Sequence, residues 1–236
     1  MTDDLRKALR ALADKEDAVF LQRFFRTGPG EYGEGDRFLG VRVPATRRIV
    51  KQFPHATLAD ALELLQSEWH EERLLALLFM VRLFKRGDAA MQRSVYESYL
   101  ANMPYVNNWD LVDSSAEHIV GPHLYGKSSA KRVLMKLARS RTLWERRIAM
   151  LSTLYFIKQK DFALALEITE QLIADQADLI HKAAGWMLRE IGDRDRAVLE
   201  AYLEPRVLRM PRTMLRYAIE KFPERKRQQY LKRRVE

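Results

Sequence analysis

A tryptophan and an aspartate four residues apart are the pair in this sequence best suited to chemistry. Trp109 and Asp113 follow two residues that commonly cap helices, Asn107 and Asn108. Residues at i and i+4 share one face of a helix, so the indole and the carboxylate would point into the same space. The carboxylate also falls near the predicted start of the helix, where the macrodipole favours an ionised acid. An aromatic surface beside a held anion suits the stabilisation of a developing cation.

The same two residues have an ordinary structural interpretation. A tryptophan at the start of a helix usually packs against its neighbours, and an aspartate in the first turn usually caps the helix or complements its dipole. The pair alone does not decide between packing and chemistry. The decision depends on the architecture that positions it.

Composition narrows the class of protein. The 236 residues contain no cysteine, which excludes disulfides, thiol nucleophiles and cysteine-ligated metals and fits a reducing cytoplasm. The longest apolar run, Leu74 to Val81, is too short to span a bilayer, and the N-terminus lacks a signal-peptide core. The five histidines form no H-x-x-x-H pair or plausible triad. We therefore expect a cytoplasmic protein that uses no metal and binds no membrane. We also expect a monomer without a cofactor, although composition does not determine the oligomeric state.

The positive charge is concentrated in two segments. The net charge is +9, and residues 205–236 hold 11 lysines and arginines against 3 acidic residues, whereas the rest of the chain holds 30 against 29. Residues 127–147 carry eight basic residues and a single acid, Glu145. Such concentration indicates a polyanionic partner, above all nucleic acid. The last dozen residues are equally consistent with a solvated helical tail.

An internal repeat predicts the fold. The segments RLLALLFMVRLFKRGD, from Arg73, and RRIAMLSTLYFIKQKD, from Arg146, align without gaps 73 residues apart. Half this offset is close to the period of helix pairs in an α-solenoid of the HEAT or armadillo kind. We therefore predict an all-α fold, a HEAT-like α-solenoid of about a dozen helices in antiparallel pairs with a concave basic face. Residues 1–236 would form a single HEAT-like repeat domain that ends in a basic helix or tail at about 223–236.

The repeat also places the candidate residues. Thirty-seven residues beyond Ala76 lies Asp113, and 36 residues beyond Ala149 lies Gly185, next to Trp186. Trp109, Asp113, Arg147 and Trp186 then recur at nearly one phase of the repeat, and we expect them to line one surface. Asp113 carries a charge where a sister repeat has alanine, which favours a functional role over capping.

Residues 27–44, TGPGEYGEGDRFLGVRVP, contain too much glycine and proline for a long helix. Gly28, Gly30 and Gly33 formally satisfy the G-x-G-x-x-G pattern. No strand precedes them, Pro29 lies inside the pattern and no βαβ unit follows, which excludes a dinucleotide site. We predict a structured loop between two N-terminal helices.

Four motifs in this order and spacing resemble a known family. YGEGDRFLGVRVP, NNWDLVD, LWERRIAML and KAAGWMLRE are similar to motifs of the DNA alkylation repair family, the AlkD-like HEAT-repeat DNA glycosylases, over about residues 5–222. The resemblance implies excision of purines whose alkylated base is positively charged, such as 3-methyladenine and 7-methylguanine, from double-stranded DNA. It thus implies a monofunctional alkylpurine DNA glycosylase of base excision repair, associated with the nucleoid when bound to DNA.

The resemblance also implies roles for five residues. Trp109 and Asp113 match the catalytic aromatic residue and carboxylate of the W-D-x-V-D motif. Arg147 matches the second arginine of W-x-R-R, and Trp186 and Arg189 match G-W-x-L-R-E. On this basis Asp113, Trp109 and Trp186 are the candidate catalytic residues. Arg147 and Arg189 are the candidate DNA-binding residues.

Alternatives stay open for these residues and for the whole protein. Trp186 lies in a helix rich in alanine and glycine and could simply pack, and Arg147 could pair with Glu145 or Asp113 rather than with phosphate. A non-catalytic HEAT-repeat module that recognises damaged or unusual DNA is the alternative function. A carboxylate on a basic surface repels DNA unless it takes part in chemistry, so the presence of Asp113 favours the enzyme.

Overall fold

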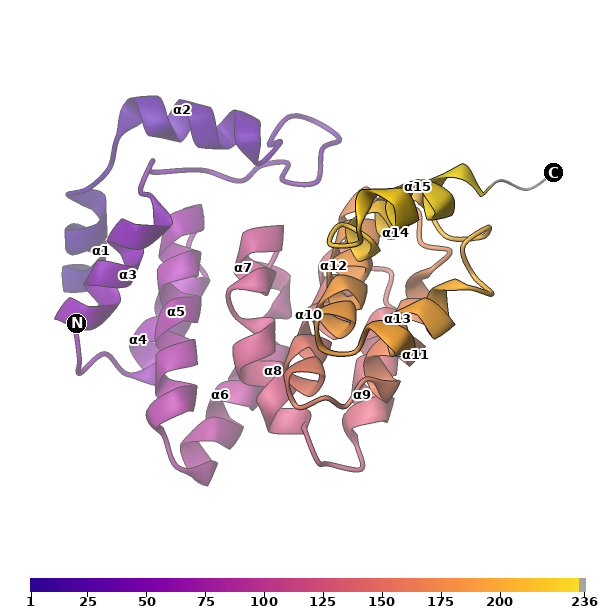
Figure 1. The fold of residues 1–236 in the computed structure, drawn as a ribbon. Coiled ribbons are helices and arrows are strands. Elements are labelled where there is room, and N and C mark those ends of the chain that lie inside the picture. The colour runs from indigo at the N-terminus through magenta and orange to yellow at the C-terminus, as the bar shows by residue number, and fades with distance from the viewer. Residues whose placement is uncertain (234–236) are drawn as a thin grey trace. The chain divides into compact units, whose positions relative to one another are not determined.

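The computed structural model describes residues 1–233 and is helical throughout this range. It contains fifteen α-helices and one short 3-10 helix, and the described residues form no strand, only an isolated bridge between Arg37 and Trp69 (Figure 1). The all-α prediction is confirmed, and the arrangement is consistent with an α-solenoid. The helices outnumber the expected dozen. The predicted tail at about 223–236 contains α15 (Glu224–Lys232), and its last three residues lie outside the described range.

Contacts along the chain separate two compact units, Met1–Ile119 and residues from Val120 onward, and the division falls inside α8. The helices that lie wholly in the first unit are α1 (Thr2–Arg10), α2 (Lys15–Phe24), α3 (Val43–Gln52), α4 (Leu58–Leu65), α5 (His70–Arg86), α6 (Ala89–Ala101), η1 (Met103–Tyr105) and α7 (Trp109–Asp113). After α8 (Ala116–Leu124), the second unit holds α9 (Ala130–Ala138), α10 (Leu143–Lys158), α11 (Ala163–Leu172), α12 (Asp178–Arg194), α13 (Arg196–Leu203), α14 (Arg212–Ala218) and α15. The concave basic face expected from the sequence stays a prediction, because the two units are described separately.

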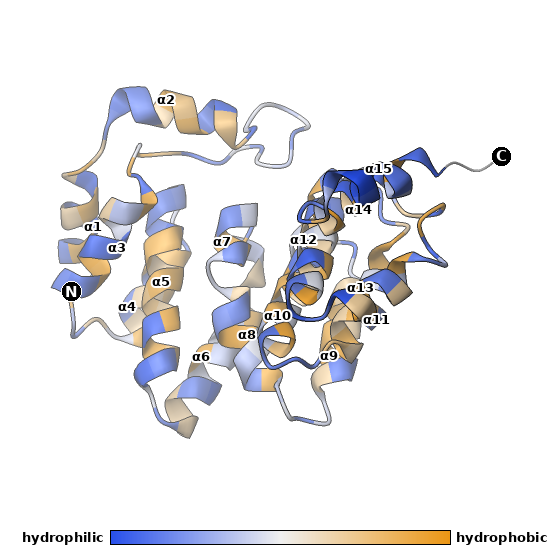
Figure 2. Ribbon diagram, in the orientation of Figure 1, coloured by the Kyte–Doolittle hydropathy of each residue, from blue (hydrophilic) through white to orange (hydrophobic). Residues whose placement is uncertain are grey.

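Each unit is built around one helix that is buried over most of its length. In the first unit this is α5, whose residues from His70 to Leu77 are all buried. In the second unit it is α10, buried almost continuously from Arg147 to Leu154. Figure 2 shows apolar residues on successive turns of α5. Neighbouring helices enclose both: α5 packs against α3, α4 and α6, and α10 packs against α9, α11 and α12.

Three helices begin with the same set of polar contacts. At each start, the side chain of residue n accepts a hydrogen bond from the amide of n+2, and its carbonyl accepts one from the side chain of n+6, at 2.6 to 3.1 Å. The sets are Ser67, Trp69 and Arg73 before α5; Ser140, Thr142 and Arg146 before α10; and Asp175, Ala177 and His181 before α12. The contacts at Ser67 and Ser140 are 73 residues apart, the same offset as in the sequence alignment. The contacts at Ser140 and Asp175 are 35 residues apart, one fewer than the step from Ala149 to Gly185.

Glycine permits the close contact between α12 and α14. A Cβ atom at Gly185 would lie 2.5 Å from the carbonyl oxygen of Met214 and 2.5 Å from the Cβ of Tyr217. Both are atoms that a rotamer change does not move out of the way, so the helices would have to separate to admit a methyl group. Gly185 thereby sets the position of its neighbour Trp186.

We expect Gly185→Ala to lower the free energy of unfolding by about 1–3 kcal/mol, the usual cost of overpacking a well-filled contact. Gly28→Ala is the matched control, because the nearest atom to its Cβ is the flexible carboxylate of Glu31 at 3.0 Å. Both variants restrict the unfolded chain in the same way. Urea unfolding of the two variants measures the difference, and equal free energies would show that α12 and α14 do not need the glycine.

Candidate functional site

The first turn of α7 begins at a buried asparagine. The side-chain oxygen of Asn108 accepts a hydrogen bond from the amide of Trp109 at 2.9 Å, and its carbonyl accepts one from Val112 at 3.2 Å. Asn108 is fully buried, whereas Asn107 is exposed. Of the two capping candidates in the sequence, Asn108 is therefore the N-cap.

A serine just beyond Asp113 ends the helix. The hydroxyl of Ser115 donates to the carbonyl of Leu111 at 2.6 Å, while the Ser115 amide bonds to Val112 instead, at 3.1 Å. A buried serine hydroxyl that takes the i−4 carbonyl competes with the helical ladder and bends it. Asp113 is thus the last residue of a five-residue helix. Asp113 therefore lies at the C-terminal end of α7, and the expectation that the helix macrodipole would help to ionise it is wrong.

Within α7 only the two ends are partly exposed. Trp109 and Asp113 have intermediate exposure, and the three residues between them, Asp110, Leu111 and Val112, are buried. The indole and the carboxylate are therefore the α7 side chains that a ligand could reach, as the i and i+4 spacing predicts.

The indole of Trp109 lies against an aromatic layer. It stacks on Phe25, with ring centroids 5.2 Å apart and planes 21° apart, and meets the edge of Phe24 at 6.0 Å. Phe25 in turn stacks on Phe38 at 5.0 Å. The aromatic layer fixes the indole of Trp109, but Trp109 stays partly exposed. Packing of this residue therefore does not exclude a role in ligand binding.

Asp113 lies where its charge acts on a buried tyrosine. Burial, together with the negative charge of Asp113, raises the pKa of the Tyr99 phenol. The Tyr99 hydroxyl and the Ser115 hydroxyl are 3.0 Å apart, so Tyr99 contacts the serine that ends α7. The first unit therefore contains Trp109, Asp113 and the side chains around them, among them Phe25, Tyr99 and Ser115.

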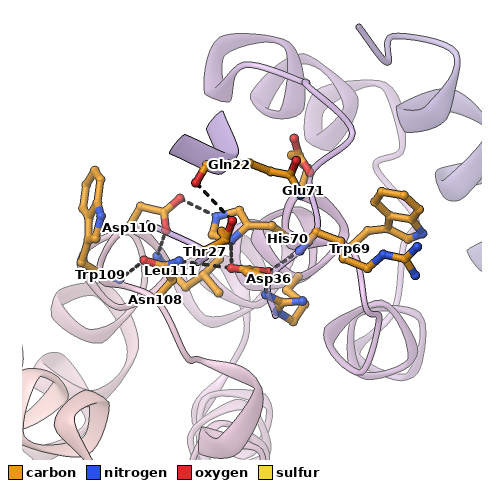
Figure 3. A network of polar contacts seen from close by, with 12 residues as sticks. Gln22, Thr27, Asp36, Trp69, His70, Glu71, Asn108, Trp109, Asp110 and Leu111 are labelled. Carbon is orange, nitrogen blue, oxygen red and sulfur yellow. Dashed lines mark hydrogen bonds and ion pairs between the residues drawn. The ribbon is translucent and has the colours of Figure 1, made fainter. Parts of the chain in front are cut away.

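A buried polar network holds the start of α7 (Figure 3). The side chains of Asp36, His70 and Asp110 are 3%, 2% and 11% exposed. His70 Nδ1 lies 2.7 Å from Asp36 and Nε2 lies 2.8 Å from Asp110. Asp36 also accepts hydrogen bonds from Arg73 at 2.6 Å and from the Asn108 side chain at 3.1 Å. In Figure 3 Asp110 points toward His70, whereas the indole of Trp109 points away from it.

The network changes the acidity of its members. Burial alone would lower the pKa of His70, but Asp110 and Asp36 outweigh it and raise that pKa to about 9. Burial alone would raise the pKa of Asp36, but His70 and Arg73 lower it to about 2. At neutral pH the ring is therefore an imidazolium and Asp36 a carboxylate.

A second carboxylate fixes the loop that carries Asp36. Glu71 is buried and accepts hydrogen bonds from three consecutive amides, those of Leu39, Gly40 and Val41, at 2.8 to 3.1 Å. Gly40 has a φ of +86°, a conformation that favours glycine. The predicted irregular loop is confirmed, since residues 25–42 contain no helix.

Sequence reasoning missed Asp36, His70, Asp110 and Ser115. A search for metal-binding pairs and catalytic triads passes over His70, because its two partners lie 34 and 40 residues away in the chain. One signal was present. The four polar residues HEER come directly before the long apolar run from Leu74 to Val81, and buried charges need partners.

The other candidate residues lie in the second unit, on α10 and α12, which pack against each other. Arg147 is buried, at 5% exposure, and donates to the carbonyl of Leu179 in the first turn of α12. Trp186 has intermediate exposure, and its indole N–H donates to Glu190 at 3.0 Å. Arg189 pairs with Glu220, whose side chain is exposed. The expectation that these residues share one surface with Trp109 and Asp113 stays a prediction.

Part of the C-terminal positive charge is balanced by acidic residues of α11 and α13 and of the turn after α13. The ion pairs join Arg206 and Arg209 to Glu170, Lys226 to Glu200, and Arg233 to Glu204. Among the described residues of this segment, Arg212, Arg216, Arg225 and Lys232 form no ion pair. The count of basic residues in this segment therefore overstates the charge that a polyanion would meet.

Metal-binding clusters and membrane-spanning helices are both absent from the described part of the chain. No group of three or more acidic or histidine side chains there could hold a metal ion. No helix in residues 1–233 is long and apolar enough to cross a membrane.

Comparison with known proteins gives one consistent result. The model of a family described as DNA alkylation repair enzyme matches residues 5–222. Among solved structures, the chain is similar to a predicted DNA alkylation repair enzyme from Enterococcus faecalis, with a TM-score of 0.70 and 16% identity, over 90% of this chain and 97% of that chain. At this identity the likeness shows a shared fold. A search of curated protein sequences found no match.

The His70 network should make stability depend on pH. Because the pKa is raised from 6.5 to about 9 on folding, the contribution is complete below pH 6.5, falls by about 1.4 kcal/mol per pH unit above it, and is lost above pH 9. We expect the free energy of unfolding to fall by roughly 3 kcal/mol across this window. Urea unfolding between pH 6 and 10 measures it.

His70→Gln should remove most of this pH dependence, whereas His55→Gln, at an exposed histidine of the same unit, should preserve it. If the free energy of unfolding changes with pH equally in wild type and His70→Gln, the assignment of a buried imidazolium is wrong.

Proposed function

Because the chain belongs to the DNA alkylation repair enzyme family and thus has a role in the repair of alkylated DNA, we propose that it is a monofunctional DNA glycosylase. Its substrates would be cationic alkylated purines, 3-methyladenine and 7-methylguanine, in duplex DNA. The observation that carries the proposal is the exposure pattern of α7, which leaves the indole of Trp109 and the carboxylate of Asp113 within reach of a ligand while anchoring everything between them.

The chemistry of such lesions needs few catalytic groups. A purine alkylated at N3 or N7 carries a positive charge, so its glycosidic bond is weak and the base leaves as a neutral molecule. A water oxygen bonds to C1′, the C1′–N bond breaks with its electron pair passing to the base, and a proton leaves the water. One ionised carboxylate can stabilise the cationic sugar and orient that water, which is the role proposed for Asp113.

The two tryptophans would attract the cationic nucleoside. An indole face attracts a positive charge by ~0.5–2 kcal/mol, depending on how far water is excluded. The stack on Phe25 fixes the ring of Trp109, and the hydrogen bond to Glu190 fixes that of Trp186. Rings held in this way lose little freedom when a ligand binds.

The two arginines would bind the phosphate backbone of duplex DNA. Arg189 is paired with an exposed glutamate, and an exposed ion pair is weak enough for a phosphate to replace the partner. Arg147 is buried, so a phosphate could reach only part of its guanidinium. We propose a monomer that works without a cofactor in the cytoplasm, on the DNA of the nucleoid.

Asp113→Asn tests the proposal most sharply. The change is nearly isosteric but removes the negative charge, so we expect single-turnover excision of 7-methylguanine from a duplex to fall roughly 100-fold or more, the scale for losing one preorganised electrostatic group. DNA affinity should hold or improve. Asp88→Asn is the matched control, because asparagine can also provide the N-cap that Asp88 gives α6.

Full activity of Asp113→Asn, or efficient excision of a neutral base such as uracil, would refute the mechanism. A non-catalytic DNA-binding module would then be the better account.

Arg147→Ala should weaken binding to all duplex sequences alike and reduce the slope of log K against log salt by about 0.9, the value for one phosphate contact. Binding titrations at several salt concentrations measure the slope, and thermal unfolding reports stability in parallel. An unchanged slope with reduced stability would mean that Arg147 only joins α10 to α12.

A further inference from the structure

The imidazole ring of His70 lies between the two acidic side chains that hold the start of α7, Asp36 and Asp110. His70 contacts Asp110 directly at 2.8 Å and reaches Asn108 through Asp36, which lies 2.7 Å from the ring and 3.1 Å from the Asn108 amide group. Asn108 and Asp110 are the two neighbours of Trp109 in the chain. His70 therefore holds both sides of the residue proposed to attract the lesion.

Both contacts of the ring require a proton on its nitrogen. The partners are carboxylate oxygens, which only accept hydrogen bonds when ionised, and a neutral imidazole offers a single N–H. Neutral His70 would place a nitrogen lone pair against a carboxylate at 2.7 or 2.8 Å. One of the two contacts would then be repulsive, and the carboxylate would have to move.

The charges around the ring balance only while it is protonated. The groups that face it are Asp36 from the loop and Asp110 from α7, and Arg73 of α5 pairs with Asp36. Two carboxylates then meet one imidazolium and one guanidinium. Loss of the ring proton would leave a net negative charge in a buried cluster, which is strongly unfavourable.

The ring also reaches the indole through aromatic contacts. His70 stacks on Phe38, with centroids 4.5 Å apart, and lies 5.0 Å from Phe25, which stacks on Trp109 at 5.2 Å. A cation over an aromatic face is attracted to it, so the imidazolium helps to hold this layer as well. Backbone and ring of Trp109 thus depend on the same group.

We propose that His70 is the positioning residue of the site: its imidazolium holds Trp109 and, through α7, Asp113 in the arrangement that excision requires, and the site loosens when the ring loses its proton. This inference rests on the proposed function for its effect on catalysis, but not for its effect on Trp109. With the pKa of His70 raised to about 9, the arrangement is stable at neutral pH and is lost in the alkaline range.

The first test follows the wild-type protein by nuclear magnetic resonance and needs no activity. The signals of the His70 ring and of the Trp109 indole should shift together between pH 7.5 and 10, with one midpoint near 9. The indole of Trp144, in the second unit, is the control and should not follow. In His70→Gln the Trp109 signal should lose this transition. If the Trp109 signal stays constant while His70 titrates, the inference is wrong.

The second test measures single-turnover excision of 7-methylguanine by wild type and His70→Gln at saturating enzyme. At pH 7.5 we expect the variant to be roughly 10- to 100-fold slower, as when a catalytic group is misplaced by about an ångström, with DNA affinity little changed. The rate of wild type divided by that of His70→Gln should fall several-fold as pH rises through 9. Ionisation of the lesion affects both rates equally and therefore cancels in this ratio. His55→Gln should match wild type throughout.

The two tests separate the inference from the proposed function. A ratio that is constant with pH would show that His70 acts only on stability and would overturn the catalytic part. If wild type excises no base but Trp109 follows His70 in the titration, the proposed function fails and the positioning of Trp109 stands. If His70→Gln does not fold, the wild-type titration alone decides whether the ring positions the indole.

Discussion

The ion-paired imidazolium of His70 is the contact on which the candidate site depends. It joins three segments that are distant in the sequence: the loop that carries Asp36, the start of α5, and the first turn of α7. Removing one partner from a buried charge cluster costs about 3–5 kcal/mol, because the remaining charge has no compensation. The position of a helix as short as α7 cannot come from its own hydrogen bonds, since five residues are too few to be stable alone. It comes from this cluster and from the aromatic layer beside it.

The division of α7 into anchored and accessible residues agrees with the chemistry proposed for it. Its buried middle residues face the unit, and its two ends leave an indole and a carboxylate partly exposed. A cationic base needs no strong acid to depart, so an aromatic ring and one anion, both held rigidly, are sufficient in principle. The Ser115 hydroxyl contributes by bonding to the carbonyl of Leu111, next to the point where the helix ends after Asp113. The family to which the chain belongs acts on alkylated DNA, and such damage includes bases with this positive charge.

Local patterns in the sequence predicted the features that depend on neighbours in the chain. The apolar periodicity indicated helices, the glycines and prolines of residues 27–44 indicated a loop, and the pair Asn107 and Asn108 indicated the start of α7. The features that were missed arise from side chains far apart in sequence. No local signal pairs Asp36 with His70, and the early end of α7 depends on a hydroxyl that competes for a backbone carbonyl. The charge of the C-terminal segment was counted correctly, but its ion pairs with Glu170 and Glu204 appear only in three dimensions.

We propose that this chain releases positively charged bases from DNA by electrostatic stabilisation rather than by acid catalysis. The most direct measurement is the profile of free bases that the wild-type protein releases from duplex DNA treated with a methylating agent, determined by mass spectrometry. We expect release of 7-methylguanine and 3-methyladenine, with one abasic site formed per base and neutral O6-methylguanine left in place. Release of neutral bases at comparable rates, or binding of the DNA without release of any base, would contradict it.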